Sequence, residues 1–149
     1  MATRSNIAYK TEDGKIRSVY AHWDGYPECN GKILLDNYKN IEKIKALIEL
    51  GSISSLGSEI GEQQDFNNRE TQNKEWTLAY HRDRGEELVI REYNDIPSWI
   101  DDMEEYAYLW DGNDWLVNDH GERDDKTGFP IFNFVEDKMR PDVLKEIWG

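Results

Sequence analysis

The chain has 149 residues, and 31 Asp and Glu against 18 Lys and Arg give it a formal net charge of −13 at neutral pH. This length predicts one domain, since folded domains usually contain roughly 100–200 residues. The acidity argues against autonomous binding to nucleic acid or anionic membranes, because both require clustered basic side chains. Only 38% of the residues are hydrophobic, but 6 Trp, 8 Tyr and 4 Phe can supply a core, so disorder is not expected.

Cysteine usage and the lack of long apolar runs bear on the compartment. Cys29 is the only cysteine, so neither an intramolecular disulfide nor a thiolate cluster can form. The first residues are polar, and no run of roughly 18 apolar residues occurs that could span a membrane. We therefore expect a soluble protein of a reducing cytoplasm, without a signal peptide.

The first predicted element is a β-hairpin. Runs of strand-forming residues at 5–11 and 16–24 are separated by Glu-Asp-Gly-Lys at 12–15, and Asp-Gly between such runs favours a tight turn. Alternation places Val19, Ala21 and Trp23 on one face of the second strand, and the strand is expected to end at Gly-Tyr-Pro, 25–27.

Residues 31–50 have a helical pattern. Apolar residues recur at helical spacing from Ile41 to Ile48, Asn40 is suited to cap the N-terminus and Gly51 to end the helix. A short helix is predicted before Asn40. Residues 52–74 are rich in Gly, Ser, Gln and Asn, which indicates a turn followed by a mobile polar loop.

Two further hairpins are predicted after this loop. The first joins 75–81 to 87–93 around Asp-Arg-Gly at 83–85, and the second joins 106–110 to 115–118 around Asp-Gly-Asn at 111–113. An apolar run at 129–135 and a helix beginning near Pro141 complete the chain. The prediction is an α+β fold with a mainly antiparallel sheet and two or three helices packed on one face.

Charge divides this single domain, 1–149, into three parts. Residues 1–94 contain 16 acids and 13 bases and form a nearly neutral scaffold, whereas residues 95–125 contain 11 acids and one base, for a net charge of −10. Residues 126–149, the predicted C-terminal strand and helix, contain four of each. The acidic segment is therefore the distinctive feature of the sequence.

Three readings of the acidic segment remain open. It can be a solvated face that keeps the protein soluble. It can bind a hard cation, although Asp111-Gly112-Asn113-Asp114 lacks the spacing of a calcium loop, so no metal site is predicted. It can also occupy the basic groove of a nucleic-acid enzyme, with aromatic rings as anchors. The candidate partner-binding residues are Asp101, Asp102, Glu104, Glu105, Asp111, Asp114, Trp99, Trp110 and Trp115.

A second candidate site combines histidine and arginine near strand ends. Arginine can bind phosphate bidentately and histidine can act as acid or base, so the set could bind or hydrolyse a nucleotide-like phosphate. An ordinary structural role, with the arginines paired to neighbouring carboxylates, is the competing reading. The set consists of His22, Asp24, His81, Arg82 and Arg84.

No motif for catalysis or for a cofactor is present. The sequence has no phosphate-binding glycine loop, no nucleophile elbow and no His-Glu-x-x-His. We therefore predict a protein that is not an enzyme and uses no cofactor, with no catalytic residue.

Four segments carry a resemblance to a known group. MATRS-x-IA at 1–8, the nine residues 19–27 with HWDGYP at their end, 31–35 and 80–86 resemble small accessory proteins of tailed bacteriophages, over about residues 1–90. The resemblance implies a phage gene product acting in the cytoplasm of an infected bacterium. It implies no catalytic residue.

The expected function follows from this resemblance and from the acidic segment. Small acidic phage proteins without catalytic motifs commonly bind a host protein, as inhibitors of restriction or CRISPR systems do. We expect stoichiometric counter-defence or host takeover, with the acidic segment on a basic, nucleic-acid-handling surface and no direct nucleic-acid or membrane binding. The alternatives are the phosphate site above and a minor component of the virion.

Overall fold

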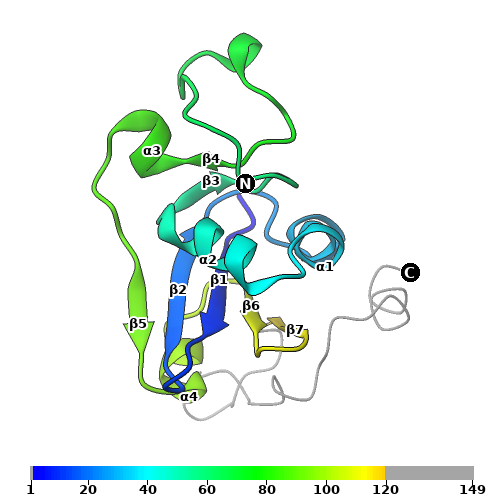
Figure 1. The fold of residues 1–149 in the computed structure, drawn as a ribbon, viewed down its shortest axis with the longest axis vertical. Coiled ribbons are helices and arrows are strands. Elements are labelled where there is room, and N and C mark those ends of the chain that lie inside the picture. The colour runs from blue at the N-terminus through cyan, green and yellow to red at the C-terminus, as the bar shows by residue number, and fades with distance from the viewer. Residues whose placement is uncertain (1, 120–149) are drawn as a thin grey trace.

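A computed structural model describes residues 2–119, which form a mixed sheet covered on both faces by short helices (Figure 1). The hydrogen-bonded strand order is β4-β3-β2-β1-β6-β7, and β5 pairs with β2 beside this path. Parts of the predicted acidic segment, beyond residue 119, and the predicted run 129–135 and terminal helix lie outside the described residues. No helix in the described part is long and apolar enough to cross a membrane.

The first predicted hairpin is confirmed. β1 (Ser5–Lys10) and β2 (Ile16–Ala21) pair antiparallel from Ser5 opposite Ala21 to Lys10 opposite Ile16. Gly14 takes a φ of +85° in the turn, a backbone conformation that glycine adopts without steric cost. β2 ends at Ala21, three residues before the predicted end, and the His22 and Trp23 N–H groups beyond it still donate to the Ile53 and Ser54 carbonyls.

The last predicted hairpin is also confirmed, and it explains why the sheet is mixed. β6 (Tyr106–Trp110) and β7 (Trp115–Asp119) pair antiparallel, and the Asp111 side chain accepts the backbone N–H groups of Asn113 and Asp114 in the turn. β6 lies parallel to β1. The α+β class is therefore correct, whereas the sheet is mixed and not built only from hairpins.

The predicted helical region contains two helices after the π-helical turn Pro27–Gly31. α1 (Lys32–Asn37) is followed by α2 (Ile41–Glu49), whose first turn is capped by a 2.8 Å hydrogen bond from the Lys43 backbone N–H to the Asn40 side chain. Gly51 follows α2 with a φ of +78°. The predicted cap and the predicted end are both confirmed.

The prediction of a hairpin across 75–93 is wrong. β4 (Leu78–Ala79) pairs with β3 (Ile53–Ser55), the chain then forms α3 (Tyr80–Arg84), and β5 (Arg91–Tyr93) pairs with β2. The two segments pair with different partners because α3 turns the chain away between them. The region predicted as a mobile loop contains β3 and the 3-10 turn Arg69–Thr71.

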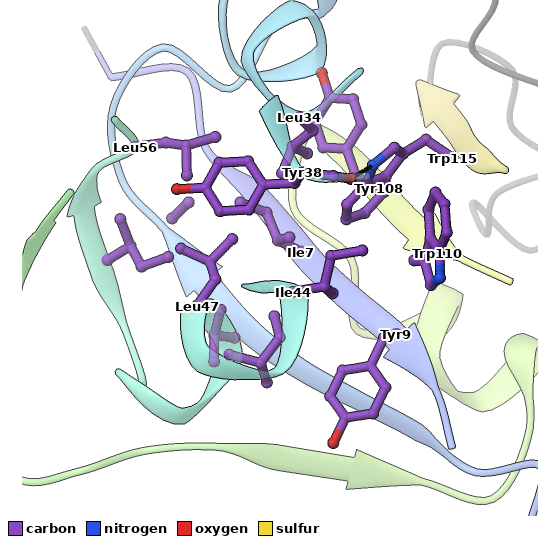
Figure 2. Packing of buried hydrophobic residues seen from close by; sticks show 14 of the residues in the cluster. Ile7, Tyr9, Leu34, Tyr38, Ile44, Leu47, Leu56, Tyr108, Trp110 and Trp115 are labelled. Atoms are coloured by element: carbon purple, nitrogen blue, oxygen red, sulfur yellow. Dashed lines mark hydrogen bonds between the residues drawn. The ribbon is translucent and has the colours of Figure 1, made fainter. Parts of the chain in front are cut away.

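Two cores lie on the two faces of the sheet. On the first face, α1 and α2 cover strand residues such as Ile7 and Tyr108, and Figure 2 shows Leu34, Tyr38 and Ile44 packed there. On the second face, α4 (Ile96–Asp101) packs with residues that include Ala8 and Leu109. The prediction that helices cover one face is therefore wrong, because the chain crosses to the second face before it enters β6.

Candidate functional site

The six candidate partner-binding carboxylates lie in two groups, at opposite ends of β6. Asp101, Asp102, Glu104 and Glu105 precede the strand, whereas Asp111 and Asp114 follow it. A strand rises about 3.3 Å per residue, so the six steps from Glu105 to Asp111 separate the groups by roughly 20 Å. In the described part of the chain, these carboxylates do not form one continuous row.

The three indoles predicted as partner anchors belong to the two cores. Trp99 contributes to the second face, and Trp110 and Trp115 contribute to the first (Figure 2). Trp99 donates a 2.8 Å hydrogen bond from Nε1 to the Ser18 hydroxyl, and Trp115 donates one of 2.8 Å to the Tyr38 carbonyl. In this fold these rings stabilise the protein and are not available as surface anchors.

Trp23 is the exposed tryptophan of the described residues, with 44% of its surface accessible. Its loop, residues 22–27, is fixed through its backbone. The Asn30 side chain donates to the Trp23 carbonyl, Asn30 N–H donates to the Asp24 carbonyl, and Gly25 N–H donates to the Thr3 carbonyl at 2.8 Å. The loop therefore presents an indole on a rigid backbone.

Two residues of this loop have backbone requirements of their own. Asp24 has a φ of +58°, an uncommon value for a residue other than glycine. A Cβ on Gly25 would lie 2.8 Å from the Thr3 carbonyl oxygen, so the close approach to the N-terminal segment needs glycine. These restraints account for the Asp-Gly pair within HWDGYP.

The loop and the first acidic group leave the sheet at the same end. Ser5 lies between Ala21, the last residue of β2, and Tyr106, the first residue of β6. Neighbouring strands are about 4.8 Å apart, so the end of β2 and the start of β6 are about 10 Å apart. The register also places the backbone of Asp119 opposite Tyr106, at this same end.

Ring and hydrogen-bond contacts connect Trp23 with Tyr20, and the charges of the carboxylates before β6 act on the Tyr20 hydroxyl. The Trp23 ring meets the His22 ring edge-on at 4.6 Å, and His22 Nδ1 is hydrogen-bonded to the Tyr20 hydroxyl at 2.6 Å. Burial raises the pKa of Tyr20, and the charges of Glu104 and Glu105 raise it further, against the opposing effect of Arg4. Five of these side chains form a surface that we call the aromatic–acidic edge: Tyr20, His22, Trp23, Glu104 and Glu105. Arg4 is not part of it.

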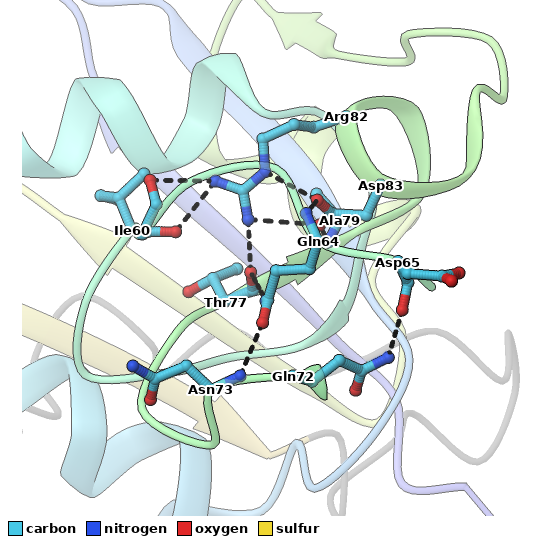
Figure 3. Close-up of polar contacts among 10 residues, drawn as sticks. Ile60, Gln64, Asp65, Gln72, Asn73, Thr77, Ala79, Arg82 and Asp83 are labelled. Atoms are coloured by element: carbon cyan, nitrogen blue, oxygen red, sulfur yellow. Dashed lines mark hydrogen bonds and ion pairs between the residues drawn. The ribbon is translucent and has the colours of Figure 1, made fainter. Parts of the chain in front are cut away.

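The predicted phosphate site is not assembled as a cluster of free groups. Arg82 donates to the Ile60 and Thr77 carbonyls and pairs with the buried Asp83 carboxylate, which also accepts the backbone N–H groups of Gln64 and Ala79 (Figure 3). This clamp holds the polar loop against α3. The arginine is therefore structural in the described fold.

The other members of the predicted set are also engaged. Arg84 pairs with Glu86 and its guanidinium stacks over the Phe66 ring, while His81 Nδ1 is hydrogen-bonded to the Glu86 carbonyl at 2.7 Å. Within residues 2–119, no hydrogen bond or ion pair joins His22 or Asp24 to these α3 residues. The ordinary structural reading accounts for every contact of the two arginines.

Neither a metal-binding group among the described residues nor a match to a known protein points to a further site. Among residues 2–119, no three His, Cys, Asp or Glu side chains are grouped so as to hold a metal ion. Comparison with models of protein families, with curated proteins and with solved structures finds no match to this chain.

Sequence reasoning missed the role of Trp23, which alternation placed on one face with Val19 and Ala21, whereas the fold buries those two residues and exposes Trp23. The signal that could have identified it is the Asp-Gly pair directly after it. Residues that favour turns end a strand early. The side chain just before them then no longer follows the alternation between the two faces of the sheet.

Proposed function

We propose that this chain acts by binding a protein that has a basic surface, and that the aromatic–acidic edge is the contact. The observation that supports this proposal is the position of one exposed indole, Trp23, on a loop with a fixed backbone at the same end of the sheet as Glu104 and Glu105. A rigid loop loses little conformational entropy on binding, and tryptophan is enriched among residues that dominate interface energies.

The carboxylates give this surface its preference for a basic partner. Four acids, Asp101, Asp102, Glu104 and Glu105, directly precede β6 at this end of the sheet, and Arg4 is the basic residue that partly offsets their negative field at Tyr20. Such a field accelerates encounter with a positively charged surface and disfavours acidic partners. The indole then supplies the desolvated contact that charge alone does not provide.

The partner class that we propose is a nucleic-acid-handling host protein. Surfaces that bind phosphate backbones are basic, and a carboxylate-rich edge can occupy such a surface in place of DNA or RNA. Together with the resemblance to phage accessory proteins, this supports stoichiometric counter-defence or host takeover in the cytoplasm of an infected bacterium. Occupation by one edge needs no continuous row of carboxylates.

The alternative of a phosphate site has less support. Its two arginines, Arg82 and Arg84, are already paired with Asp83 and Glu86 in the described structure. A role as a minor virion component has no specific observation in its favour.

The test is capture of host proteins from a lysate of infected bacteria on the immobilised full-length chain, followed by mass spectrometry. We expect a basic, nucleic-acid-handling protein to be enriched, and Trp23→Ala or the double variant Glu104→Lys, Glu105→Lys to lose it. The matched control, Glu62→Lys with Glu70→Lys, makes the same change in net charge at two exposed positions of the polar loop.

Kinetics with the captured protein give a second readout. Charge reversal at Glu104 and Glu105 should slow association and reduce its dependence on salt, whereas Trp23→Ala should mainly speed dissociation. The proposal is wrong if the control pair and the edge variants bind alike, or if the enriched proteins are acidic.

A further inference from the structure

A cleft lies where the edge of β2 is left unpaired. β3 pairs with β2 at Ala21, and β5 pairs with it at Ile16–Ser18, so Val19 and Tyr20 lie between the two partner strands (Figure 1). A cleft of about 360 Å³ opens over this gap, within the range of small-molecule sites. Its lining includes Ser18, Tyr20, Arg91, Tyr93, Asp102 and Glu104.

The gap leaves a backbone donor directed toward the cleft. His22 N–H donates to the Ile53 carbonyl at 2.9 Å on the outer edge of β2. Backbone N–H groups two residues apart in a strand point to the same side, so Tyr20 N–H points to this edge as well. Within residues 2–119, β1 pairs with β2 at Tyr20 on the inner edge, but neither β3 nor β5 pairs with it there on the outer edge. An unpaired edge N–H is a ready donor for a carboxylate or carbonyl oxygen.

The two walls of the cleft carry opposite charges. Asp102 and Glu104 lie on one wall, and Arg91 lies on the wall formed by β5. Within the described residues, Arg91 forms no ion pair, and neither carboxylate forms one. The cleft therefore separates a guanidinium from two carboxylates without pairing them inside the protein.

Both walls and the floor are held in place by hydrogen bonds. The Tyr93 hydroxyl donates to Asp102 at 2.9 Å, and burial together with this bond raises the pKa of Tyr93 to about 12, so the phenol remains a donor at neutral pH. Glu104 N–H donates to the Asn6 side chain at 2.6 Å. On the floor, the buried Ser18 hydroxyl accepts from Trp99 Nε1. Side chains restrained in this way form a preorganised site.

We propose that this cleft binds a small zwitterion of the α-amino-acid class. The ligand's carboxylate lies toward Tyr20 N–H and Arg91, and its ammonium group lies toward Asp102 and Glu104. A ligand of a single charge sign would meet a wall of its own sign, which disfavours simple cations and simple anions. This inference does not rest on the proposed function, because it concerns a free small molecule and shares only Tyr20 and Glu104 with the aromatic–acidic edge.

The test is titration of the ¹⁵N-labelled full-length chain with each of the twenty free L-α-amino acids, followed by NMR. We expect at least one of them to give saturable shifts at the amides of Tyr20, Arg91 and Glu104 with a millimolar or lower Kd. Its N-acetyl derivative and its carboxamide each lack one charge, so each should bind at least about tenfold more weakly. The inference is overturned if no amino acid shifts these amides, or if both derivatives bind as tightly as the parent.

Matched variants locate the site. Arg91→Gln and Glu104→Gln should each weaken binding about tenfold or more, while Lys39→Gln and Glu62→Gln, at exposed positions outside the cleft, should leave it unchanged. Equal affinity in the cleft variants and the controls would overturn the inference. Partner capture that is retained in Trp23→Ala, together with intact amino-acid binding, would count against the proposed function alone.

Discussion

The hydroxyl of Tyr108, in the core under β6, donates a 2.6 Å hydrogen bond to the backbone carbonyl of Gly25. These residues are 83 positions apart in the sequence. The bond fixes the loop that carries Trp23 to the strand that follows the acidic residues Glu104 and Glu105. The geometry of the aromatic–acidic edge therefore depends on the parallel pairing of β6 with β1.

Tyr108→Phe tests this dependence. The substitution leaves the buried Gly25 carbonyl without its donor, so we expect a loss of about 1–2 kcal/mol in the free energy of unfolding. It should also weaken partner capture, because the loop is less restrained. Denaturant unfolding measures the first effect, and an unchanged unfolding midpoint would show that the bond contributes nothing.

Trp23 and Trp115 should respond in opposite ways to substitution. Trp115→Phe removes a buried ring and the bond to the Tyr38 carbonyl, so it should cost about 2 kcal/mol of stability and leave partner affinity intact once folded. Trp23→Ala removes an exposed ring and should change stability by no more than about 0.5 kcal/mol. Thermal unfolding of both variants, beside partner capture, distinguishes the two roles. A large loss of stability in Trp23→Ala would contradict the assignment.

Asp83 should be the critical residue of the α3 clamp. Asp83→Ala leaves the half-buried Arg82 guanidinium without its carboxylate and two backbone N–H groups without an acceptor, so we expect a loss of about 3–5 kcal/mol. Amide hydrogen exchange should increase first in residues 57–77. The control is Arg84→Ala, whose pair with Glu86 is exposed and should contribute at most about 1 kcal/mol. Similar losses in both variants would contradict the clamp.

Tyr38 should make stability fall at alkaline pH. Burial raises its pKa to about 12 in the folded chain, from the ordinary value of 10.0. The pKa of Tyr38 is higher in the folded chain than in the unfolded chain. The contribution of its protonated hydroxyl to the free energy of unfolding is therefore fully present below pH 10 and is lost as the pH rises from about 10 to about 12. Tyr38→Phe removes the 2.7 Å bond to the Gly57 carbonyl and lowers stability at neutral pH, but the alkaline decline should become smaller. Unfolding free energies measured across this range test the sign, and an unchanged decline would refute it.

The candidate site could be predicted only in part. The sequence identified the acidic residues and the HWDGYP loop, but placed the aromatic anchors at Trp99, Trp110 and Trp115. Alternation along β6 shows which residues share a face, yet it does not show that both faces are covered. Because α1 and α2 cover one face and α4 the other, the rings on both sides become core.

The features that could be predicted from the sequence are those set by interactions between residues close together in the chain. The Asp-Gly turns at 13–14 and 111–112, the Asn40 cap and Gly51 act within a few residues of the chain, so the two hairpins and α2 were predictable. Tertiary structure alone decided the parallel pairing of β1 with β6, the helix at Tyr80–Arg84 and the unpaired edge at Tyr20. Each of these features depends on contacts between segments that are far apart in the chain. The free energy of such contacts is not determined by any short stretch of sequence.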